Sequence, residues 1–434
     1  MDTLSSRGRR ATSPALSYFN LFFEGMEKGL YSTTNLDGYI LLAVAENRLL
    51  YESVALPRFN SRTVRTQIGN DAGAYSSMTG RKSLKKAWAE FMTRTVLKKY
   101  KVDSSNLIIG AGVGSLISNL AFLLCEPGDG ILLPVPAYGA LFNDFKVVAE
   151  AVVVDVICEA PLYRITEEAL NKSLERALHN GTIVRILFIV NPNNPFGFVY
   201  SKEELLFLIQ WATENNLHIV IDEIYANSVW DKDETFVSAL DIISDKECIS
   251  LDLDRIHILW GASKDLSLSG YRMGVLHTVN KALQTSFANV NYFHTVSNDT
   301  QDALAAFISD ETFIDSYLLQ SKDLLRASYT EVTRLLTESK IPFVSATSGM
   351  FLWIDLRMCL LPFTNLSDPF ESERELTKSL FEKCKILFTP GQAMHASEPG
   401  FYRVCYAWQP IETVIVAFKR LKEFIDNLEH VSKS

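Results

Sequence analysis

Lys264 is the residue whose position most strongly indicates covalent chemistry. It follows the apolar run 256–260, in the stretch Gly261-Ala262-Ser263-Lys264-Asp265. A lysine beside an apolar wall has a lowered pKa, and its neutral amine is a nucleophile that can form a Schiff base with an aldehyde. Arg272 lies eight residues later, in Gly270-Tyr271-Arg272-Met273-Gly274, where a guanidinium can bind a phosphate through two hydrogen bonds.

Three further motifs follow apolar runs and carry complementary polar groups. In Gly110-Ala111-Gly112-Val113-Gly114-Ser115, small residues let backbone N–H groups at a helix N-terminus approach a phosphate. Asn191-Pro192-Asn193-Asn194-Pro195-Phe196-Gly197 combines two prolines and three asparagines in a sharp loop. Ile221-Asp222-Glu223-Ile224-Tyr225 can present a carboxylate and a phenol to one cleft. Each motif alone is also compatible with an ordinary turn or strand end.

Together the motifs supply a partner for every polar group of pyridoxal 5′-phosphate. They supply an amine for the aldehyde and a carboxylate for the ring nitrogen. They also supply a phenol and an amide for the ring hydroxyl, and cationic and backbone donors for the phosphate. An ionised Asp222 would keep the ring nitrogen protonated, so that the ring can accept the electrons left at the substrate's Cα. The ordered set therefore predicts an enzyme that depends on this cofactor.

The elements that position these motifs alternate between strands and helices from about residue 106. The apolar runs predicted as strands are 107–109, 131–135, 151–157, 184–190, 218–221, 256–260 and 275–277. Several are apolar at successive positions, which is typical of strands covered on both faces. One intervening helix is expected to begin at Ser201, with Glu204 completing a capping box. The pattern predicts an α/β fold with a large, mostly parallel sheet flanked by helices.

After about residue 281 the pattern changes to that of a smaller α+β domain. A long helix over 311–339, strands over 351–355 and 403–406, and a last helix with one apolar stripe are expected there. The expected organisation is a flexible N-terminal tail (1–13), an N-terminal segment contributing to the small domain (14–70), a large cofactor-binding domain (71–281), and interdomain helices with the small domain (282–434).

Composition narrows the class of protein. Of 434 residues, 47% are hydrophobic and 21% are charged, which excludes a largely disordered chain. The net charge of −9 argues against nucleic acid or an anionic membrane as a partner. No apolar run reaches the roughly 18 residues of a membrane span, and the N-terminus is too polar for a secretory signal. The six cysteines show no metal-ligand or CxxC spacing, so we expect reduced thiols, no metal site and a cytoplasmic location.

On these motifs the sequence resembles the fold-type I pyridoxal-phosphate enzymes of the class I/II aminotransferase superfamily. Within that group it is similar to the aminocyclopropane-carboxylate synthase branch, from about Tyr18 to Leu428. Besides Ser263-Lys264-Asp265, the branch-like stretches are Leu42-Ala43-Val44-Ala45-Glu46-Asn47 and Tyr402-Arg403-Val404-Cys405-Tyr406-Ala407. The resemblance implies an amino-acid substrate and a homodimer with active sites near the subunit interface.

The resemblance also implies roles for individual residues. Lys264 would form the Schiff base and remove the Cα proton, Asp222 would pair with the ring nitrogen, and Tyr225 would contact the ring hydroxyl; these three are the expected catalytic residues. The other expected cofactor contacts are Asn194 at the ring hydroxyl, Tyr138 stacked on the ring, and Gly114, Ser115, Ser263 and Arg272 at the phosphate.

Three residues are expected around the substrate. Arg403 would bind the α-carboxylate bidentately, through two of its guanidinium nitrogens, and Glu46 and Tyr18 match residues near the substrate in the synthases. Tyr18 and Tyr138 are also compatible with ordinary buried aromatic positions.

Two positions depart from the pattern of the branch. Met78 stands where the synthases carry a tyrosine that reaches the partner's cofactor. Either this phosphate or substrate contact is lost, or Tyr75 provides it from a shifted position. Gly261 replaces a serine and so removes one phosphate hydroxyl. Three functions stay open: elimination, cyclisation or replacement at the β or γ carbon of a sulfur- or sulfonium-bearing amino acid such as S-adenosylmethionine; transamination with a 2-oxo acid acceptor; and a catalytically inactive regulatory protein.

Overall fold

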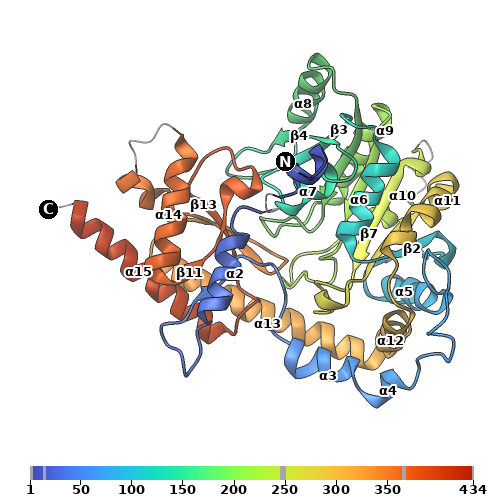
Figure 1. Ribbon diagram of the computed structural model, residues 1–434, viewed down its shortest axis with the longest axis horizontal. Coiled ribbons are helices and arrows are strands. Elements are labelled where there is room, and N and C mark those ends of the chain that lie inside the picture. Colours follow the sequence, from blue (N-terminus) through green and yellow to red (C-terminus); the bar gives the residue numbers. More distant parts are fainter. Residues whose placement is uncertain (1–2, 13–15, 245–250, 364–367, 433–434) are drawn as a thin grey trace.

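A seven-stranded sheet forms the centre of the larger part of the molecule (Figure 1). The computed structural model describes residues 3–12, 16–244, 251–363 and 368–432. The strands of this sheet are β2 (Leu107–Gly110), β3 (Gly130–Val135), β4 (Val152–Ile157), β5 (Val184–Val190), β6 (His218–Asp222), β7 (Ile256–Gly261) and β8 (Gly274–Thr278). Their order is β2-β8-β7-β6-β5-β3-β4, and only β8 runs antiparallel to its neighbours. The predicted mostly parallel sheet is confirmed.

Helices cover both faces of this sheet. Along β5, Ile186 and Phe188 belong to one hydrophobic core and Leu187 and Ile189 to another, because successive side chains point to opposite faces. The first core also holds α6 (Val113–Leu124), α7 (Ala140–Lys146) and α11 (Lys281–Val290). The second holds α5 (Lys82–Thr95), α8 (Glu167–His179), α9 (Lys202–Glu214) and α10 (Ala239–Ile243). This two-sided burial explains why the strand sequences are continuously apolar.

The predicted start of one helix is confirmed in detail. Ser201 caps α9: its Oγ accepts from the Glu204 N–H at 3.1 Å, while the Glu204 carboxylate accepts from the Ser201 N–H at 2.7 Å. The reciprocal bonds satisfy two backbone donors that the helix itself leaves unpaired.

A second, antiparallel sheet lies in the smaller part. Its order is β12 (Thr389–Pro390), β13 (Phe401–Cys405), β10 (Phe351–Asp355) and β9 (Phe343–Val344), beside α14 (Pro369–Cys384) and α15 (Ile411–Ser432). A separate parallel pair joins β1 (Ile40–Leu41) to β11 (Ile386–Leu387), so the N-terminal segment lies against the C-terminal part. The long helix α13 (Glu311–Glu338) contributes to both cores and runs along both parts (Figure 1).

The segment expected as a flexible tail contains a short helix, α1 (Ser6–Arg10), capped by Ser5. The helix α2 (Phe19–Lys28) follows. Five cysteines of the described chain are free thiols, and Cys248 lies outside the described residues. Within the described ranges, no helix combines the length and apolar character that crossing a membrane requires.

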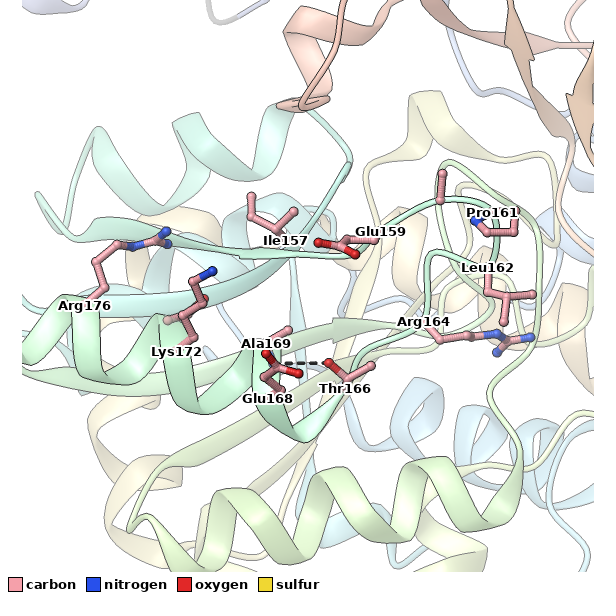
Figure 2. Close-up of a pocket in the computed structure, with 12 residues that line it drawn as sticks. Ile157, Glu159, Pro161, Leu162, Arg164, Thr166, Glu168, Ala169, Lys172 and Arg176 are labelled. Carbon is pink, nitrogen blue, oxygen red and sulfur yellow. Dashed lines mark hydrogen bonds between the residues drawn. The ribbon is translucent and has the colours of Figure 1, made fainter.

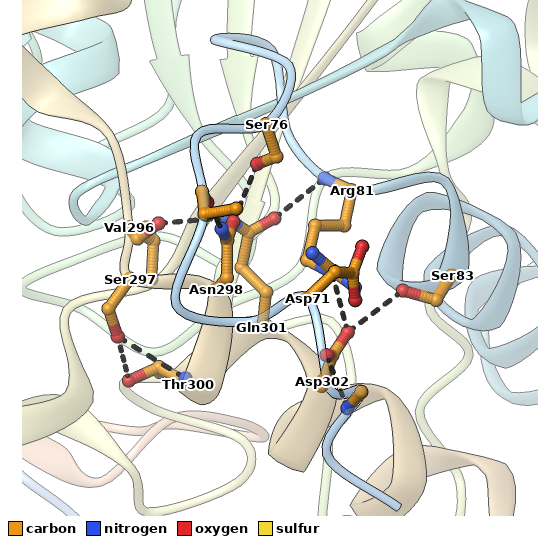
Figure 3. A network of polar contacts seen from close by, with 12 residues as sticks. Asp71, Ser76, Arg81, Ser83, Val296, Ser297, Asn298, Thr300, Gln301 and Asp302 are labelled. Carbon is orange, nitrogen blue, oxygen red and sulfur yellow. Dashed lines mark hydrogen bonds and ion pairs between the residues drawn. The ribbon is translucent and has the colours of Figure 1, made fainter.

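Short helices and one loop complete the large part. The helices are α3 (Leu56–Phe59), α4 (Arg62–Arg65) and α12 (Asn298–Ser309). Figure 3 shows how polar groups of α12 hold the loop before α5. The Ser76 hydroxyl donates to the Asn298 amide oxygen at 2.6 Å, and Arg81 Nε donates to the buried Asp302 carboxylate at 2.7 Å. Tyr75, on this held loop, is 96% exposed.

The arrangement of strands brings the predicted motifs to one edge of the large sheet. The carboxyl ends of β2, β3, β5, β6 and β7 meet there, and the antiparallel β8 begins at the same edge. Each of the five motifs expected to bind the cofactor lies at one of these ends or, in the case of Arg272, directly precedes β8. Open α/β sheets bind their ligands at this edge.

Candidate active site

A cavity of about 240 Å³ lies at this edge of the sheet. Eight of the nine residues predicted to bind the cofactor line it: Gly114, Tyr138, Asn194, Asp222, Tyr225, Ser263, Lys264 and Arg272. The ninth, Ser115, lies in the first turn of α6, where its hydroxyl donates to the Gly112 carbonyl at 2.9 Å. The structure therefore brings together groups that the sequence spreads over about 160 residues, from 114 to 272.

Lys264 presents a weakly basic amine to this cavity. Burial lowers the pKa of its side chain to about 8, and the positive charges of Arg403 and Arg272 lower it further. The Nζ atom donates to the carbonyl of Ala45 at 2.5 Å, and no described carboxylate lies within ion-pair distance. A substantial fraction of the amine is thus neutral near physiological pH, as a nucleophile or a base must be.

Asp222 is the acidic residue among those predicted to bind the cofactor, and it is buried. It ends β6, and its carboxylate accepts from the Ile224 N–H at 3.1 Å. Burial raises the pKa of this carboxyl to about 7, against the lowering effects of that hydrogen bond and of Lys264. A protonated ring nitrogen is the kind of partner that would bring the pKa back down, so the carboxyl fits a pyridinium.

Lys264 and Asp222 are each followed in the sequence by an acidic residue that holds the local turn in place. The Asp265 carboxylate accepts from the Asn227 N–H at 2.7 Å and from the Ser228 hydroxyl at 2.6 Å, which ties the lysine turn to the turn after β6. The Glu223 carboxylate accepts from Trp260 Nε1 at 3.1 Å and from two groups at the start of α10. Sequence reasoning gave neither acid a role.

Arg403 is a buried cation without an anion. It lies on β13, is 1% exposed, and donates to the Ala43 carbonyl at 2.7 Å, to the Thr389 hydroxyl at 3.1 Å and to the Asn194 amide oxygen at 3.1 Å. Its Nε has no hydrogen-bond partner, and no ion pair joins it to a described carboxylate. Because a buried charge is costly unless paired, this guanidinium suits a substrate carboxylate.

Neutral donors surround the place expected for the ring. The oxygen of the Asn194 amide is used by Arg403, so its N–H groups are left to donate elsewhere. Burial raises the pKa values of the Tyr138 and Tyr225 phenols above their usual range, which keeps both hydroxyls protonated. These groups can therefore donate to an anionic ring oxygen.

The three expected substrate residues do not line the cavity themselves: they are Tyr18, Glu46 and Arg403. Arg403 contacts the cavity residue Asn194, and Glu46 contacts the cavity residue Ser269. Glu46 accepts hydrogen bonds from Ser269, which lines the cavity, and from Trp408 Nε1 at 3.1 Å. Tyr18 is buried, and burial raises the pKa of its phenol while Arg403 lowers it. The expected substrate residues thus form one layer next to the expected cofactor residues.

The expected phosphate end is built from closely packed backbone. A Cβ on Gly112 would lie 2.5 Å from Arg272 Nη2, so the guanidinium lies directly against this glycine, whose φ of +87° also favours glycine. A Cβ on Gly261 would lie 3.0 Å from a methyl of Val113, which is a tight contact. Val113, Asp144 and Ser269 also line the cavity, and none carries a sequence motif that identifies it.

These observations fit pyridoxal 5′-phosphate. The cavity offers an amine for the aldehyde, a buried carboxyl for the ring nitrogen, protonated donors for the ring hydroxyl, and Arg272 with a glycine-lined helix N-terminus for the phosphate. In the described part of the chain, no three His, Cys, Asp or Glu residues are placed to hold a metal ion.

A second cavity, of about 420 Å³, lies between β4 and α8 (Figure 2). Its cations are largely committed to protein oxygens: Arg164 donates to the Val199 carbonyl at 3.0 Å, and Arg176 to the Asp155 carbonyl at 2.6 Å. None of the predicted site residues lines it. The chemistry therefore belongs to the smaller cavity at the sheet edge.

Comparison with known proteins gives the same picture over nearly the whole chain. The family described as aminotransferase class I and II matches residues 37–421. The chain is 32% identical to 1-aminocyclopropane-1-carboxylate synthase 11 of Arabidopsis thaliana, over 95% of this chain and 89% of that protein. It is 31% identical to 1-aminocyclopropane-1-carboxylate synthase 2 of Cucurbita pepo, over 90% of this chain and 79% of that protein.

Solved structures share the fold at lower identity. An aspartate aminotransferase from Thermus thermophilus with maleate superposes with a TM-score of 0.79 at 19% identity, covering 98% of this chain and all of that one. An aspartate aminotransferase from Thermotoga maritima gives a TM-score of 0.76 at 21% identity, with the same coverage.

The first prediction concerns Lys264. Pyridoxal 5′-phosphate added to the protein should produce the visible absorption band of a Schiff base, and both Lys264→Ala and Lys264→Arg should abolish it because neither offers an amine. Since only the neutral amine reacts, the rate of band formation should rise with pH and level off above about 8. Lys172→Ala, an exposed lysine of the second cavity, is the control and should keep the band. An unchanged band in Lys264→Ala would contradict the assignment.

Proposed function

The chain belongs to the class I and II aminotransferase family, and from this premise we propose that it removes the Cα proton of an α-amino acid and then carries out elimination, cyclisation or replacement at the β or γ carbon. Membership makes it a pyridoxal-phosphate-dependent enzyme of fold type I, which confirms the expected fold and cofactor. The finer reaction is our inference from the residues around Lys264 and from the named relatives.

One observation carries the proposal. The Lys264 amine and the Arg403 guanidinium are close enough for the arginine to lower the pKa of the lysine, and neither has a carboxylate partner among the described residues. An α-amino acid carries the missing carboxylate, and its Cα lies one bond from that group. Binding through Arg403 would therefore present the Cα proton to a base held on the same side.

Each residue has a definite task in such a reaction. When bound, the cofactor supplies an electron sink for the pair left at Cα. Lys264 takes the Cα proton at Nζ, and its lowered pKa keeps that atom neutral before the transfer. Asp222 holds positive charge at the ring nitrogen, and its burial excludes the water that would screen the pair.

The remaining residues orient the two ligands. Tyr225 and the Asn194 N–H groups would hold the ring hydroxyl, Tyr138 would cover the ring face, and Ser263 and Arg272 would bind the phosphate with the backbone of residues 114–115. Because the Asn194 oxygen accepts from Arg403, the same amide couples the position of the substrate carboxylate to that of the ring.

A sulfonium-bearing substrate is supported by charge and by the named relatives. Glu46, on the substrate side, raises the pKa of Lys264 through its negative charge and is held in place by Ser269 and Trp408. A fixed carboxylate there favours a cationic group on the substrate side chain. Two relatives with 31–32% identity over most of the chain are named aminocyclopropane-carboxylate synthases, and S-adenosylmethionine is the sulfonium amino acid we propose.

Transamination is the alternative fate of the same deprotonated substrate. Two departures from the synthase pattern favour it: Met78 stands in place of a tyrosine, and Gly261 stands in place of a serine. Both reactions need Lys264 and Arg403, so only the products distinguish them.

The test of the reaction is to incubate the cofactor-loaded enzyme with S-adenosylmethionine and follow methylthioadenosine by mass spectrometry. We expect methylthioadenosine to form with wild type well above the level of an enzyme-free control and with Lys264→Ala only at that level, because the enzymatic release requires loss of the Cα proton. Conversion of a 2-oxo acid to its amino acid without methylthioadenosine would assign transamination instead. No turnover in a screen of amino acids with a bound cofactor would favour the regulatory protein.

A second prediction concerns the carboxylate clamp. Arg403→Lys should lower kcat/KM by about a hundredfold or more, mainly through KM, because a single ammonium cannot replace a bidentate guanidinium. The matched control is the substrate amine that lacks the α-carboxylate, for which wild type and variant should react equally. Retention of the visible cofactor band would show that the variant is folded. Equal kinetics with the amino acid would place the clamp elsewhere.

We also propose that the enzyme is a homodimer that uses the face around Tyr75. Three large aromatic side chains on this face are exposed: Tyr75 at 96%, Tyr292 at 57% and Phe293 at 78%. The two segments that carry them are joined by the bond from Asn291 to the Met78 carbonyl, and the network of Figure 3 holds the loop of Tyr75 in place. Exposed aromatic clusters of this kind suit a protein–protein contact.

The corresponding prediction is a change of oligomeric state. Phe293→Asp should convert a dimer into a monomer in sedimentation velocity, because it would place a charge in a desolvated contact. Leu178→Asp, an equally exposed leucine on α8, should leave the dimer intact. A wild-type protein that sediments as a monomer at all concentrations would disprove the dimer.

A further inference from the structure

Asp144 is an acid in the cavity for which the proposed function has no task. It lies on α7, the helix that follows Tyr138, and its carboxyl lines the cavity beside the first turn of α6. A Cβ built on Gly114 would be 3.3 Å from its Oδ2, so the carboxyl lies directly against this glycine. Within the described chain it has no hydrogen bond and no ion pair.

Its surroundings make a permanent negative charge unfavourable. Burial raises the pKa of the Asp144 carboxyl to about 7, although the positive charge of Arg272 acts in the opposite direction. The other titratable groups near it are the Asp222 carboxyl and the Tyr138 phenol, and the negative charge of Asp144 raises the pKa values of both. Lys264, across the cavity, forms no ion pair with it.

The same place is where the proposed function puts the phosphate. Arg272 lies against Gly112 and Asp144 lies against Gly114, so the two side chains flank the loop that opens α6. An ionised carboxylate next to a phosphate dianion would repel it, whereas a neutral carboxylic acid has one O–H to donate. The Ser115 hydroxyl at this end already donates to the Gly112 carbonyl, whereas the Asp144 carboxyl beside Gly114 has no protein partner among the described residues.

We propose that Asp144 contacts the cofactor phosphate as a neutral carboxylic acid that donates a hydrogen bond, so that binding takes up one proton and weakens as the solution becomes alkaline. This inference rests on the proposed placement of the phosphate at residues 112–115. It makes Asp144 a sensor of pH for cofactor retention and assigns it no part in the chemical step.

The experiment measures binding of pyridoxamine 5′-phosphate, which cannot form a Schiff base with Lys264, to the cofactor-free enzyme between about pH 6.5 and 9. Relative to Asp144→Asn, which keeps an N–H donor and carries no charge, wild type should lose about tenfold in affinity per pH unit above about 7. Asp144→Ala should bind more weakly than both at the acid end. Calorimetry in buffers of different ionisation enthalpy should show about one more proton taken up by wild type than by Asp144→Asn near pH 8.

Two controls separate this inference from the placement on which it rests. Arg272→Ala should weaken binding of pyridoxamine 5′-phosphate and leave unphosphorylated pyridoxamine unaffected; no effect of that variant would mean that the phosphate binds elsewhere, and both proposals would fall. If Arg272→Ala has its effect while wild type and Asp144→Asn show parallel pH profiles, only the role of Asp144 is overturned. A pH difference that persists with pyridoxamine would also overturn it, because the carboxyl would then act on the ring. Proton uptake by wild type tests the idea without any variant.

Discussion

Positive charge without a fixed counter-ion is the constraint on which this active site depends. Lys264, Arg272 and Arg403 act on one cavity, and no described carboxylate forms an ion pair with any of them. Burial and the positive charges of Arg403 and Arg272 keep the lysine amine weakly basic, and the buried Arg403 is left in need of an anion. In the proposed function the cofactor phosphate and the substrate carboxylate would supply anions to Arg272 and Arg403, so the charge pattern would prepare the site for binding and for proton transfer at once.

The site holds this unfavourable pattern because buried carboxyls fix its turns. Asp265 joins the lysine turn to the turn after β6, and Glu223 joins the ends of β6 and β7 to α10. Each stands directly after a residue of the proposed chemistry, one on the lysine turn and one at Asp222. A single chain position thus supplies the reactive group and the next supplies its anchor, which limits how far either turn can move.

The larger part of the molecule contributes the contacts expected for the cofactor, and the smaller part contributes those expected for the substrate. The large sheet provides the residues expected at the cofactor, whereas Arg403 comes from β13 and Glu46 and Ala45 come from the N-terminal segment that pairs with the C-terminal part. Asn194 connects the two sets through its bond to Arg403. Any movement of the smaller part against the larger one would therefore change the positions of the residues expected at the substrate carboxylate and at the cofactor ring.

The sequence alone determined the strand–helix order and the mostly parallel sheet and predicted the residues proposed for the cofactor, because apolar periodicity and short motifs are local properties. Lys264, Asp222 and Asn194 could be named since each lies at or shortly after the end of a buried strand. Asp144, by contrast, has no motif and lies in an ordinary helical stretch, and its importance arises only because α7 packs its carboxyl against Gly114. The unpaired state of Arg403 and the anchoring by Asp265 were likewise decided by tertiary structure, since whether a charge has a partner depends on which distant segments surround it.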